Sequence, residues 1–249
     1  MIFTKQRLGF RVIRILYQGE NLSDVISRYR PDYCTVVAYE HVPLEPLGFR
    51  VTEKNIANIY LDGDIAAVFG RFTVSTRNEI NRTLRDPDFV FRTPDTDVAA
   101  SYRLYCEFEK QHGRVPWKRD SFTSVLAFNA YWQGELVSTI PVYDLGNVLK
   151  VRAMASARGT AHASKERYKA VSHASRRLVY ELCRYGVAHG HRFVGLGEVT
   201  TTTEQKANVA QFKLFFGARV EREYTHTFGS RRFRTLIKWR DRVKHLFHG

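Results

Sequence analysis

The chain has 249 residues, of which 44% are hydrophobic, and it carries a formal net charge of +14. This composition is that of a globular protein, and no apolar run reaches the roughly 20 residues that a membrane-spanning helix needs. The basic excess favours an acidic partner, such as a phosphate-bearing substrate, an RNA, an acidic carrier protein or an anionic membrane face, without choosing among them.

The first residues and the cysteines indicate the cellular compartment. Residues 1–7 contain no apolar signal segment, so we expect a cytoplasmic protein. Three cysteines, Cys34, Cys106 and Cys183, lack metal-ligand spacing and lie within apolar patterns. We therefore expect reduced thiols in the core, and no metal site.

The first sixty residues predict strands and one helix in alternation. Strands are expected over 10–17, 34–39 and 58–61, and a helix over 22–29. Prolines and a glycine between 43 and 48 interrupt this pattern. That loop is the expected boundary between an N-terminal α/β subregion, residues 1–48, and the main domain.

Residues 65–84 predict one long helix, which Asp62 or Asp64 can cap and which Asp86-Pro87 ends. The face opposite its apolar stripe carries Arg71, Arg77, Arg82 and Arg85. These arginines form either a solvated face or a phosphate-binding face, because guanidinium forks can grip phosphate oxygens bidentately.

The middle of the chain changes from helices to hairpins. A strand is expected over 89–92, and helices over 97–113 and 118–126. Two turn signals then separate three alternating segments, which predicts a three-stranded antiparallel meander. Its strands are expected over 128–132, 136–143 and 148–156.

The stretch from Tyr168 to Gly217 predicts a helix, a buried strand and a second helix. A basic loop over 160–169 leads into a helix for which Ser172 is the expected cap and Gly190 the stop signal. A short apolar strand over 192–197 follows, and it places Glu198 and a run of threonines at its carboxyl end.

Capping-box spacing marks the start of the second helix. Thr201 with Glu204, or Thr202 with Gln205, has this spacing, and the helix is expected to end at Gly217.

A half-buried strand over 220–228 follows, and residues 230–249 predict a basic amphipathic helix. This helix either packs on the domain or touches an anionic membrane through residues 232–247.

This order predicts an α/β protein with a mixed, mostly antiparallel twisted sheet and helices on both faces. Residues 49–229 resemble the GNAT acyltransferase fold, and within it the Fem-type branch of peptidoglycan aminoacyltransferases and exopolysaccharide acyltransferase-like proteins. Residues 75–82, 166–172 and 211–217 carry the resemblance. The last segment is the most specific, since a Phe-Lys pair stands four residues before a helix-ending glycine. The resemblance makes residues 1–48 a candidate truncated second GNAT half.

The resemblance implies an acyl group moved from an activated carrier to an amine, where sheet strands splay apart. Ordinary GNAT enzymes carry a Gln/Arg-x-x-Gly-x-Gly/Ala turn that cradles a pyrophosphate. Here Ser156 occupies the first position, although Gly159 and Ala161 fit the spacing. This departure weakens the case for coenzyme A, but Arg158 and the Gly159 amide remain candidate donor-binding groups.

The resemblance also assigns a role to Lys213. This residue lies where ordinary members of the fold usually place a tyrosine acid, whereas Fem-type enzymes place a lysine after a phenylalanine. By resemblance, Lys213 stabilises the oxyanion formed when an amine attacks the donor carbonyl, with Phe212 beside the donor. The alternative is a surface lysine on an amphipathic helix.

Three further residues are candidates near the same edge. Glu198 at the carboxyl end of the central strand is expected to accept or orient the amine proton, since open sheets place ligands there; it competes with a role in capping. His173 and Tyr168, near the start of the preceding helix, are a candidate base and a candidate acceptor contact, and His173 can equally be a polar cap.

Two residues from other elements complete the candidate acceptor site. Arg77 belongs to the arginine face, and Trp117 can stack on a sugar, although it can equally be a core residue.

We therefore expect an N-acyltransferase that forms an amide between an activated acyl or aminoacyl donor and an amino group of a cell-envelope glycan or lipid-linked precursor. No tightly bound cofactor is expected, and the donor is acyl-CoA, an acyl carrier protein or an aminoacyl-tRNA. The location is the cytoplasm or the inner face of the plasma membrane. The alternative is a basic, tRNA-type nucleic-acid-binding module without catalysis. The arginine face and the net charge support this alternative.

Overall fold

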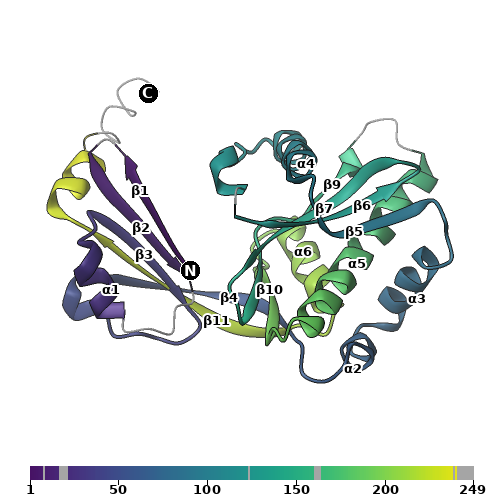
Figure 1. The fold of residues 1–249 in the computed structure, drawn as a ribbon, viewed down its shortest axis with the longest axis horizontal. Coiled ribbons are helices and arrows are strands. Elements are labelled where there is room, and N and C mark those ends of the chain that lie inside the picture. Colours follow the sequence, from purple (N-terminus) through teal and green to yellow (C-terminus); the bar gives the residue numbers. More distant parts are fainter. Residues whose placement is uncertain (8, 17–21, 123, 160–163, 238, 240–249) are drawn as a thin grey trace. The chain divides into compact units, whose positions relative to one another are not determined.

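The computed structural model describes residues 1–7, 9–16, 22–122, 124–159, 164–237 and 239 (Figure 1). The chain forms two compact units, Met1–Asn55 with Glu221–Gly249, and Ile56–Val220. The division differs from the predicted boundaries at 48 and 229. It falls within the strands β4 (Arg50–Tyr60) and β11 (Arg219–Gly229), because each of these strands continues from one unit into the other.

The first unit contains a small sheet in the order β1-β2-β3-β11-β4. Its remaining elements are β1 (Ile2–Arg7), β2 (Phe10–Leu16), α1 (Leu22–Tyr29), β3 (Tyr33–Ala38) and the 3-10 turn η1 (Glu45–Leu47). The strands β2 and β3 are parallel and are joined through α1, whereas β1 and β11 pair antiparallel with their neighbours β2 and β3. The predicted α/β subregion is therefore present, completed by a strand from the far end of the sequence.

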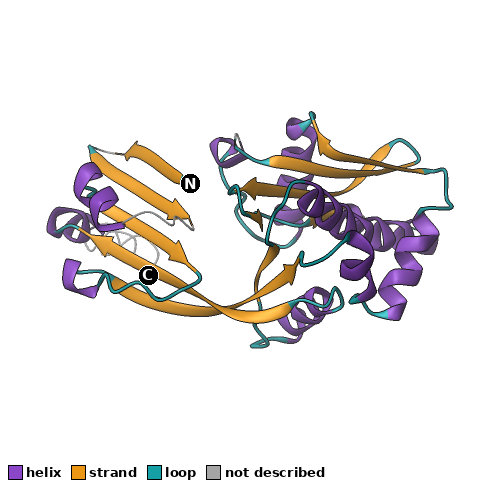
Figure 2. Cartoon of the chain, turned by 60° about the horizontal axis from the view of Figure 1, so that its bottom comes forward, coloured by secondary structure: helices purple, strands orange, loops and turns teal. Residues whose placement is uncertain are grey.

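The second unit combines five helices with a mixed sheet in its described residues (Figure 2). The helices are α2 (Ile65–Gly70), α3 (Val74–Thr83), α4 (Val98–Gln111), α5 (Lys165–Ala188) and α6 (Glu204–Leu214). Its own strands are β5 (Phe89–Asp95), β6 (Leu126–Trp132), β7 (Glu135–Asp144), β8 (Val148–Val151), β9 (Ala155–Ser156) and β10 (Phe193–Glu198). The order is β4-β10-β8-β7-β6-β5, with β9 paired to β7, and only the β10–β8 pair is parallel among the pairs described in this unit. This is the α/β architecture predicted from the sequence.

Two hydroxyl pairs show that helices cover both faces of this sheet. The Thr139 Oγ1 of β7 lies 2.6 Å from the Ser101 Oγ of α4. The Ser138 Oγ of the same strand lies 2.9 Å from the Ser175 Oγ of α5. Because successive side chains of a strand point to opposite faces, α4 and α5 lie on opposite sides of β7, as Figure 1 shows.

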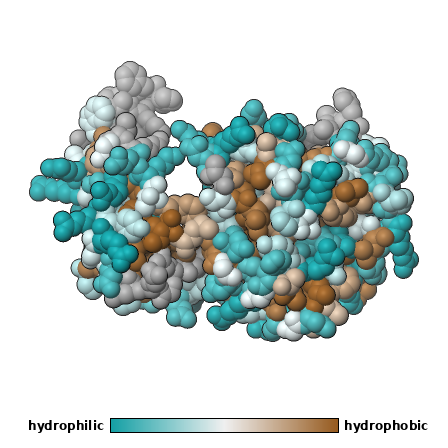
Figure 3. Space-filling model, in the orientation of Figure 1, coloured by the Kyte–Doolittle hydropathy of each residue, from teal (hydrophilic) through white to brown (hydrophobic). Residues whose placement is uncertain are grey.

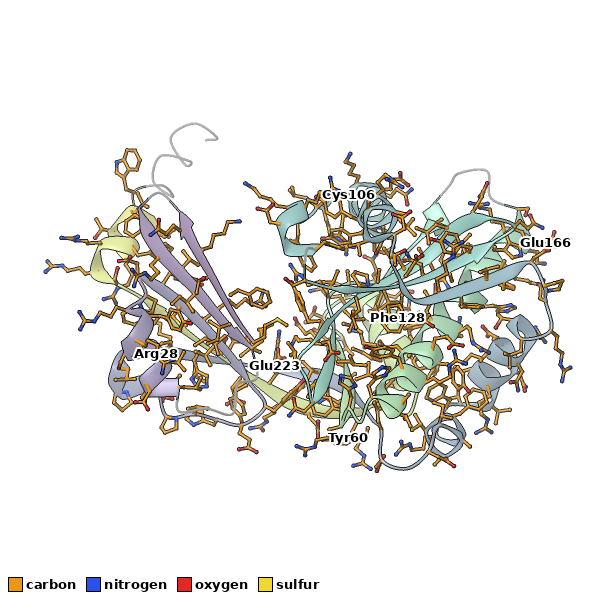
Figure 4. All side chains as sticks on the ribbon, viewed as in Figure 1. Arg28, Tyr60, Cys106, Phe128, Glu166 and Glu223 are labelled. Atoms are coloured by element: carbon orange, nitrogen blue, oxygen red, sulfur yellow. The ribbon has the colours of Figure 1, made fainter. Side chains whose placement is uncertain are left out.

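The core of the second unit is formed between α5 and the sheet. Leu178 and Leu182 of α5 are fully buried with Phe128 of β6 and Val194 of β10. Figure 4 places Phe128 inside this unit. The surface seen in Figure 3 is largely hydrophilic with scattered apolar patches, as expected for a basic protein with a 44% hydrophobic content.

The prediction of a single helix over 65–84 is wrong, because two helices, α2 and α3, form there. Asp64 caps α2, because its Oδ1 accepts a hydrogen bond from the Ala67 amide at 2.7 Å. After α2 the Thr73 amide donates to the Phe215 carbonyl at 2.9 Å. This tertiary hydrogen bond replaces the intrahelical one that a continuous helix would need.

Other predicted elements also differ from the structure. The helix predicted over 118–126 is only the 3-10 turn η2 (Arg119–Phe122), and the third meander strand ends at Val151. The cap of α5 is Ser164 and the cap of α6 is Thr203, and each hydroxyl accepts an amide three residues later. The predicted cap Ser172 lies inside α5, because polar residues extend that helix further than its apolar periodicity indicates.

The three thiols are expected to differ in reactivity. Cys34 and Cys183 are fully buried, and burial raises the pKa of Cys34 to about 12 and also raises the pKa of Cys183. Cys106 on α4 is half-buried (Figure 4). We expect iodoacetamide to modify Cys106 at least about tenfold faster than the other two, because the thiolate fraction falls about tenfold per pKa unit. Peptide mass spectrometry of the folded protein measures this, and equal rates at all three positions would contradict the burial.

Candidate functional site

The strands β8 and β10 separate at their carboxyl ends. Their parallel pairing ends with Gly195 opposite Lys150. Beyond that point β10 continues to pair with β4 up to Glu198, while β8 ends and β9 pairs with β7. A register shift between Gly195 and Gly197 marks a bulge in β10. The last residues of β10 therefore pair with β4 and not with β8, and the carboxyl end of such a strand is where an open α/β sheet binds ligands.

Lys213 of α6 reaches this end of β10. Its side chain is buried, with 8% exposure, and its Nζ donates a hydrogen bond to the Glu198 main-chain oxygen at 2.6 Å. Gly197 has a φ of +83°, and a Cβ at this position would lie 4.0 Å from the Lys213 Nζ. The glycine therefore permits the backbone conformation of the bulge beside the ammonium. Lys213 is thus not the solvated surface lysine that the sequence left open.

The Glu198 side chain is exposed, while its main-chain oxygen binds Lys213. The competing role of Glu198 as a cap of α6 is not needed, since Thr203 caps that helix with its own hydroxyl, 3.3 Å from the Lys206 amide. The carboxylate is therefore open to solvent on a residue whose main chain binds the Lys213 ammonium, an arrangement compatible with taking up a proton from a bound amine.

A second group of charged residues, which we name the α5 cluster, comprises Arg158, Tyr168, His173, Arg176 and Glu79. The Arg158 guanidinium lies over the Tyr168 ring, 5.3 Å from its centroid. Glu79 of α3 lies 3.2 Å from the Arg176 Nη1 and 3.8 Å from the His173 Nε2. One carboxylate is therefore shared between two cationic or titratable side chains of α5.

Burial and charge shift two pKa values in the α5 cluster. Burial lowers the pKa of His173, opposed by Glu79 and reinforced by neighbouring cations that include Arg82 and Arg176. This favours neutral imidazole at neutral pH. Burial also lowers the pKa of Arg158, whose Nε has no hydrogen-bond partner among the described residues.

The α5 cluster approaches the Lys213 site through Phe212. The Arg176 guanidinium lies 5.6 Å from the centroid of the Phe212 ring, and Phe212 immediately precedes Lys213. The structure thus brings Lys213, Glu198 and Phe212 together, and it groups His173 with Arg158 and Tyr168. Arg176 and Glu79 were missing from the sequence-predicted site. The position of Arg176, three residues after His173 on the same helix face, is the signal that could have revealed it.

Two predicted acceptor contacts lie outside these groups, because they make structural contacts of their own. The Arg77 Nη1 donates to the Gly70 carbonyl at 2.5 Å and so caps the end of α2. The Trp117 ring is covered by the Arg152 guanidinium, 3.2 Å from the ring centroid, and stacks on Tyr105 at 5.4 Å. A sugar-stacking role for Trp117 would require Arg152 to move.

Gly159 ends the 3-10 turn η3 (Ala157–Gly159) beside Arg158, and the following residues 160–163 lie outside the described part of the chain. Among the described residues, no group of three histidine, cysteine or carboxylate side chains could hold a metal ion. In that same part, no helix is both long enough and apolar enough to cross a bilayer.

Comparison with solved structures identifies proteins of the same fold. The sequence itself matches no family model and no curated protein. FemX superimposes with a TM-score of 0.64 at 10% identity, covering 90% of this chain and 83% of FemX. L-PGS from Bacillus licheniformis superimposes with a TM-score of 0.56 at 14% identity, covering 92% of this chain and 81% of that one.

A third similar structure is the C-terminal domain of a candidate lysylphosphatidylglycerol synthetase from Agrobacterium fabrum. Its TM-score is 0.56 at 13% identity, and the superposition covers 91% of this chain and 80% of that domain. At these identities the likeness concerns the fold. The chain therefore has the Fem-like fold that it shares with FemX.

Proposed function

We propose that this protein is an N-acyltransferase that joins an activated acyl or aminoacyl group to an amino group of a cell-envelope glycan or lipid-linked precursor. The observation that carries the proposal is the buried Lys213 ammonium, 2.6 Å from the Glu198 main-chain oxygen where β10 and β8 separate. A preorganised positive charge at this end of the strand is what acyl transfer requires of the protein, since negative charge develops on the donor carbonyl.

The proposed reaction is a displacement at the donor carbonyl. The acceptor nitrogen attacks the carbonyl carbon, and a C–N bond forms while the bond to the carrier oxygen or sulfur breaks. The Lys213 ammonium stabilises the oxyanion, the exposed Glu198 carboxylate takes the proton that the nitrogen loses, and this proton then passes to the departing oxygen or sulfur of the carrier. Little else is needed, because holding both substrates together lowers the barrier by itself.

The α5 cluster supports the donor side of the proposal. Arg158 and Arg176 are two partly buried guanidinium groups, of which Arg176 lies over the Phe212 ring, and a phosphate of the donor would pair with them bidentately. Ser156 stands where ordinary GNAT enzymes have glutamine or arginine. That departure, together with the likeness to FemX, favours aminoacyl-tRNA over acyl-CoA as the donor.

The alternative of a nucleic-acid-binding module without catalysis has less support. It rested on arginines of the segment 65–85, and two of them make intramolecular contacts. Arg71 pairs with Asp62 and donates to the Tyr60 carbonyl, while Arg77 caps α2. Neither guanidinium is free to act as one member of a row of phosphate contacts.

Thermal denaturation with candidate donors tests the proposed function. We expect one class among aminoacyl-tRNA, acyl carrier protein and acyl-CoA to raise the melting temperature, since a ligand at 100 times its Kd stabilises by about 2.7 kcal/mol. Arg158→Ala should abolish the shift, whereas Arg103→Ala on the surface of α4 should retain it. Absence of stabilisation by all three donors would contradict the proposal.

A further inference from the structure

A short helical segment follows β11 in the first unit and is fixed to it at one end. Residues 231–237 are helical. The Ser230 Oγ accepts a hydrogen bond from the Phe233 amide at 3.3 Å and lies 3.2 Å from the Asp32 Oδ1. The Phe233 ring packs on Tyr33 at 4.8 Å and on Phe10 at 5.6 Å. The segment is thereby held by one face.

A neighbouring stripe of this segment is partly exposed. Arg232, Leu236 and Trp239 are spaced four and three residues apart, so they lie on one stripe of the helix. Trp239 is 64% exposed, an unusual position for the largest apolar side chain. With Phe10, Arg231 and Thr235, these residues line an open pocket of about 560 Å³. We name the six residues the Trp239 surface.

Positive charge surrounds this apolar stripe. Arg231, Arg232 and Arg234 are exposed, and none of them makes an ion pair with a described residue. The sequence that continues from this segment adds Lys238, Arg240, Arg242 and Lys244 against a single acidic residue, Asp241. The local field therefore attracts anions, although the Asp32 carboxylate lies 3.2 Å from the Ser230 Oγ at the start of the segment.

We propose that the Trp239 surface docks on an anionic phospholipid bilayer. The arginines would contact the phosphate headgroups, while Trp239 and Leu236 enter the boundary between headgroups and acyl chains. An RNA would use the same arginines, but it offers no apolar phase for Leu236 and the pocket wall at Phe10. The combination of an aromatic, an aliphatic and a cationic residue on one stripe, with Arg231 also lining the pocket, favours the lipid surface. This inference stands independently of the proposed catalytic function.

Vesicle sedimentation with the full chain tests the docking. Vesicles of phosphatidylcholine with phosphatidylglycerol should bind the protein, and vesicles of phosphatidylcholine alone should bind it much more weakly. The double variant Arg231→Ala/Arg232→Ala should lose about thirtyfold in affinity, because each arginine near an anionic surface contributes about one kcal/mol. The matched control Arg103→Ala/Lys110→Ala removes the same charge from the exposed side of α4 and should bind as the unmodified protein does.

Tryptophan fluorescence gives a second, local readout. Of the three tryptophans, Trp132 is buried and Trp117 is stacked, so an emission blue shift on adding anionic vesicles should come from Trp239. The shift should vanish in Trp239→Phe. Equal binding by the two double variants, or binding of a single-stranded RNA that depends on Arg231 and Arg232 without binding of anionic vesicles, would overturn the proposal. Acyl-transfer assays on water-soluble substrates should not change in these variants.

Discussion

Lys213→Met is expected to lower kcat about 10²–10³-fold, the usual effect of removing one donor that stabilises a developing oxyanion. Methionine keeps much of the length and apolar character of the lysine stem but removes the charge that lies 2.6 Å from the Glu198 oxygen. KM for the donor should change little, because the lost interaction forms chiefly in the transition state. Steady-state kinetics with the donor identified by thermal denaturation measures both constants.

A control must separate this effect from misfolding, because Lys213 is buried. Lys206 belongs to the same helix and is exposed, and its Nζ reaches the Thr202 hydroxyl at 3.3 Å. Lys206→Met should retain turnover within about twofold, as surface substitutions away from a site usually do. If a folded Lys213→Met protein, with a cooperative melting transition, retained full turnover, the role of the ammonium in catalysis would be disproved.

Gly217→Ala is expected to destabilise the second unit by about 3 kcal/mol, the sum of a left-handed backbone penalty and an overpacking penalty. Gly217 has a φ of +65°, and a Cβ there would lie 2.8 Å from the Arg71 carbonyl oxygen. That oxygen is main chain and belongs to the bend between α2 and α3, so it cannot move aside as a flexible side chain would. Urea denaturation followed by circular dichroism measures the change.

Gly190→Ala is the matched control, because it measures the free-energy cost of the left-handed backbone conformation without the steric clash. Gly190 also follows a helix and has a φ of +71°, but among the described residues no atom beyond its chain neighbours lies within 4 Å of an added Cβ. The substitution should cost only about 1–2 kcal/mol, the penalty for the left-handed conformation alone. Equal destabilisation by the two substitutions would show that the close approach of Gly217 to Arg71 carries no energetic weight.

Much of the architecture follows from local signals in the sequence. The turns at Gln133-Gly134 and Gly146-Asn147 predicted the hairpins of the meander, and both glycines have positive φ. Apolar periodicity predicted α5, although not its polar first turns. The break between α2 and α3 could not be predicted, because it depends on the hydrogen bond from Thr73 to Phe215, which lies far away in the sequence.

Of the candidate site, only the central pair, Lys213 and Glu198, was predicted correctly as neighbours from the sequence. The position of Lys213 before Gly217 and of Glu198 after an apolar strand predicted two residues that meet in the structure. Arg77 and Trp117 were chosen by residue type, and each makes contacts that no local pattern encodes. Arg176 was missed because its spacing from His173 places both on one helix face but does not reveal that they share the carboxylate of Glu79.

The first unit is built from both ends of the sequence, and this affects how it can fold during translation. Strand β3 lies near the start of the sequence and pairs with residues 224–229 of β11, whereas the second unit is one continuous stretch of chain. During translation the second unit can therefore complete its core while β3 still exposes an unpaired edge. The nascent N-terminal strands must avoid aggregation until β11 has been synthesised. A chaperone that protects them would bind at this edge.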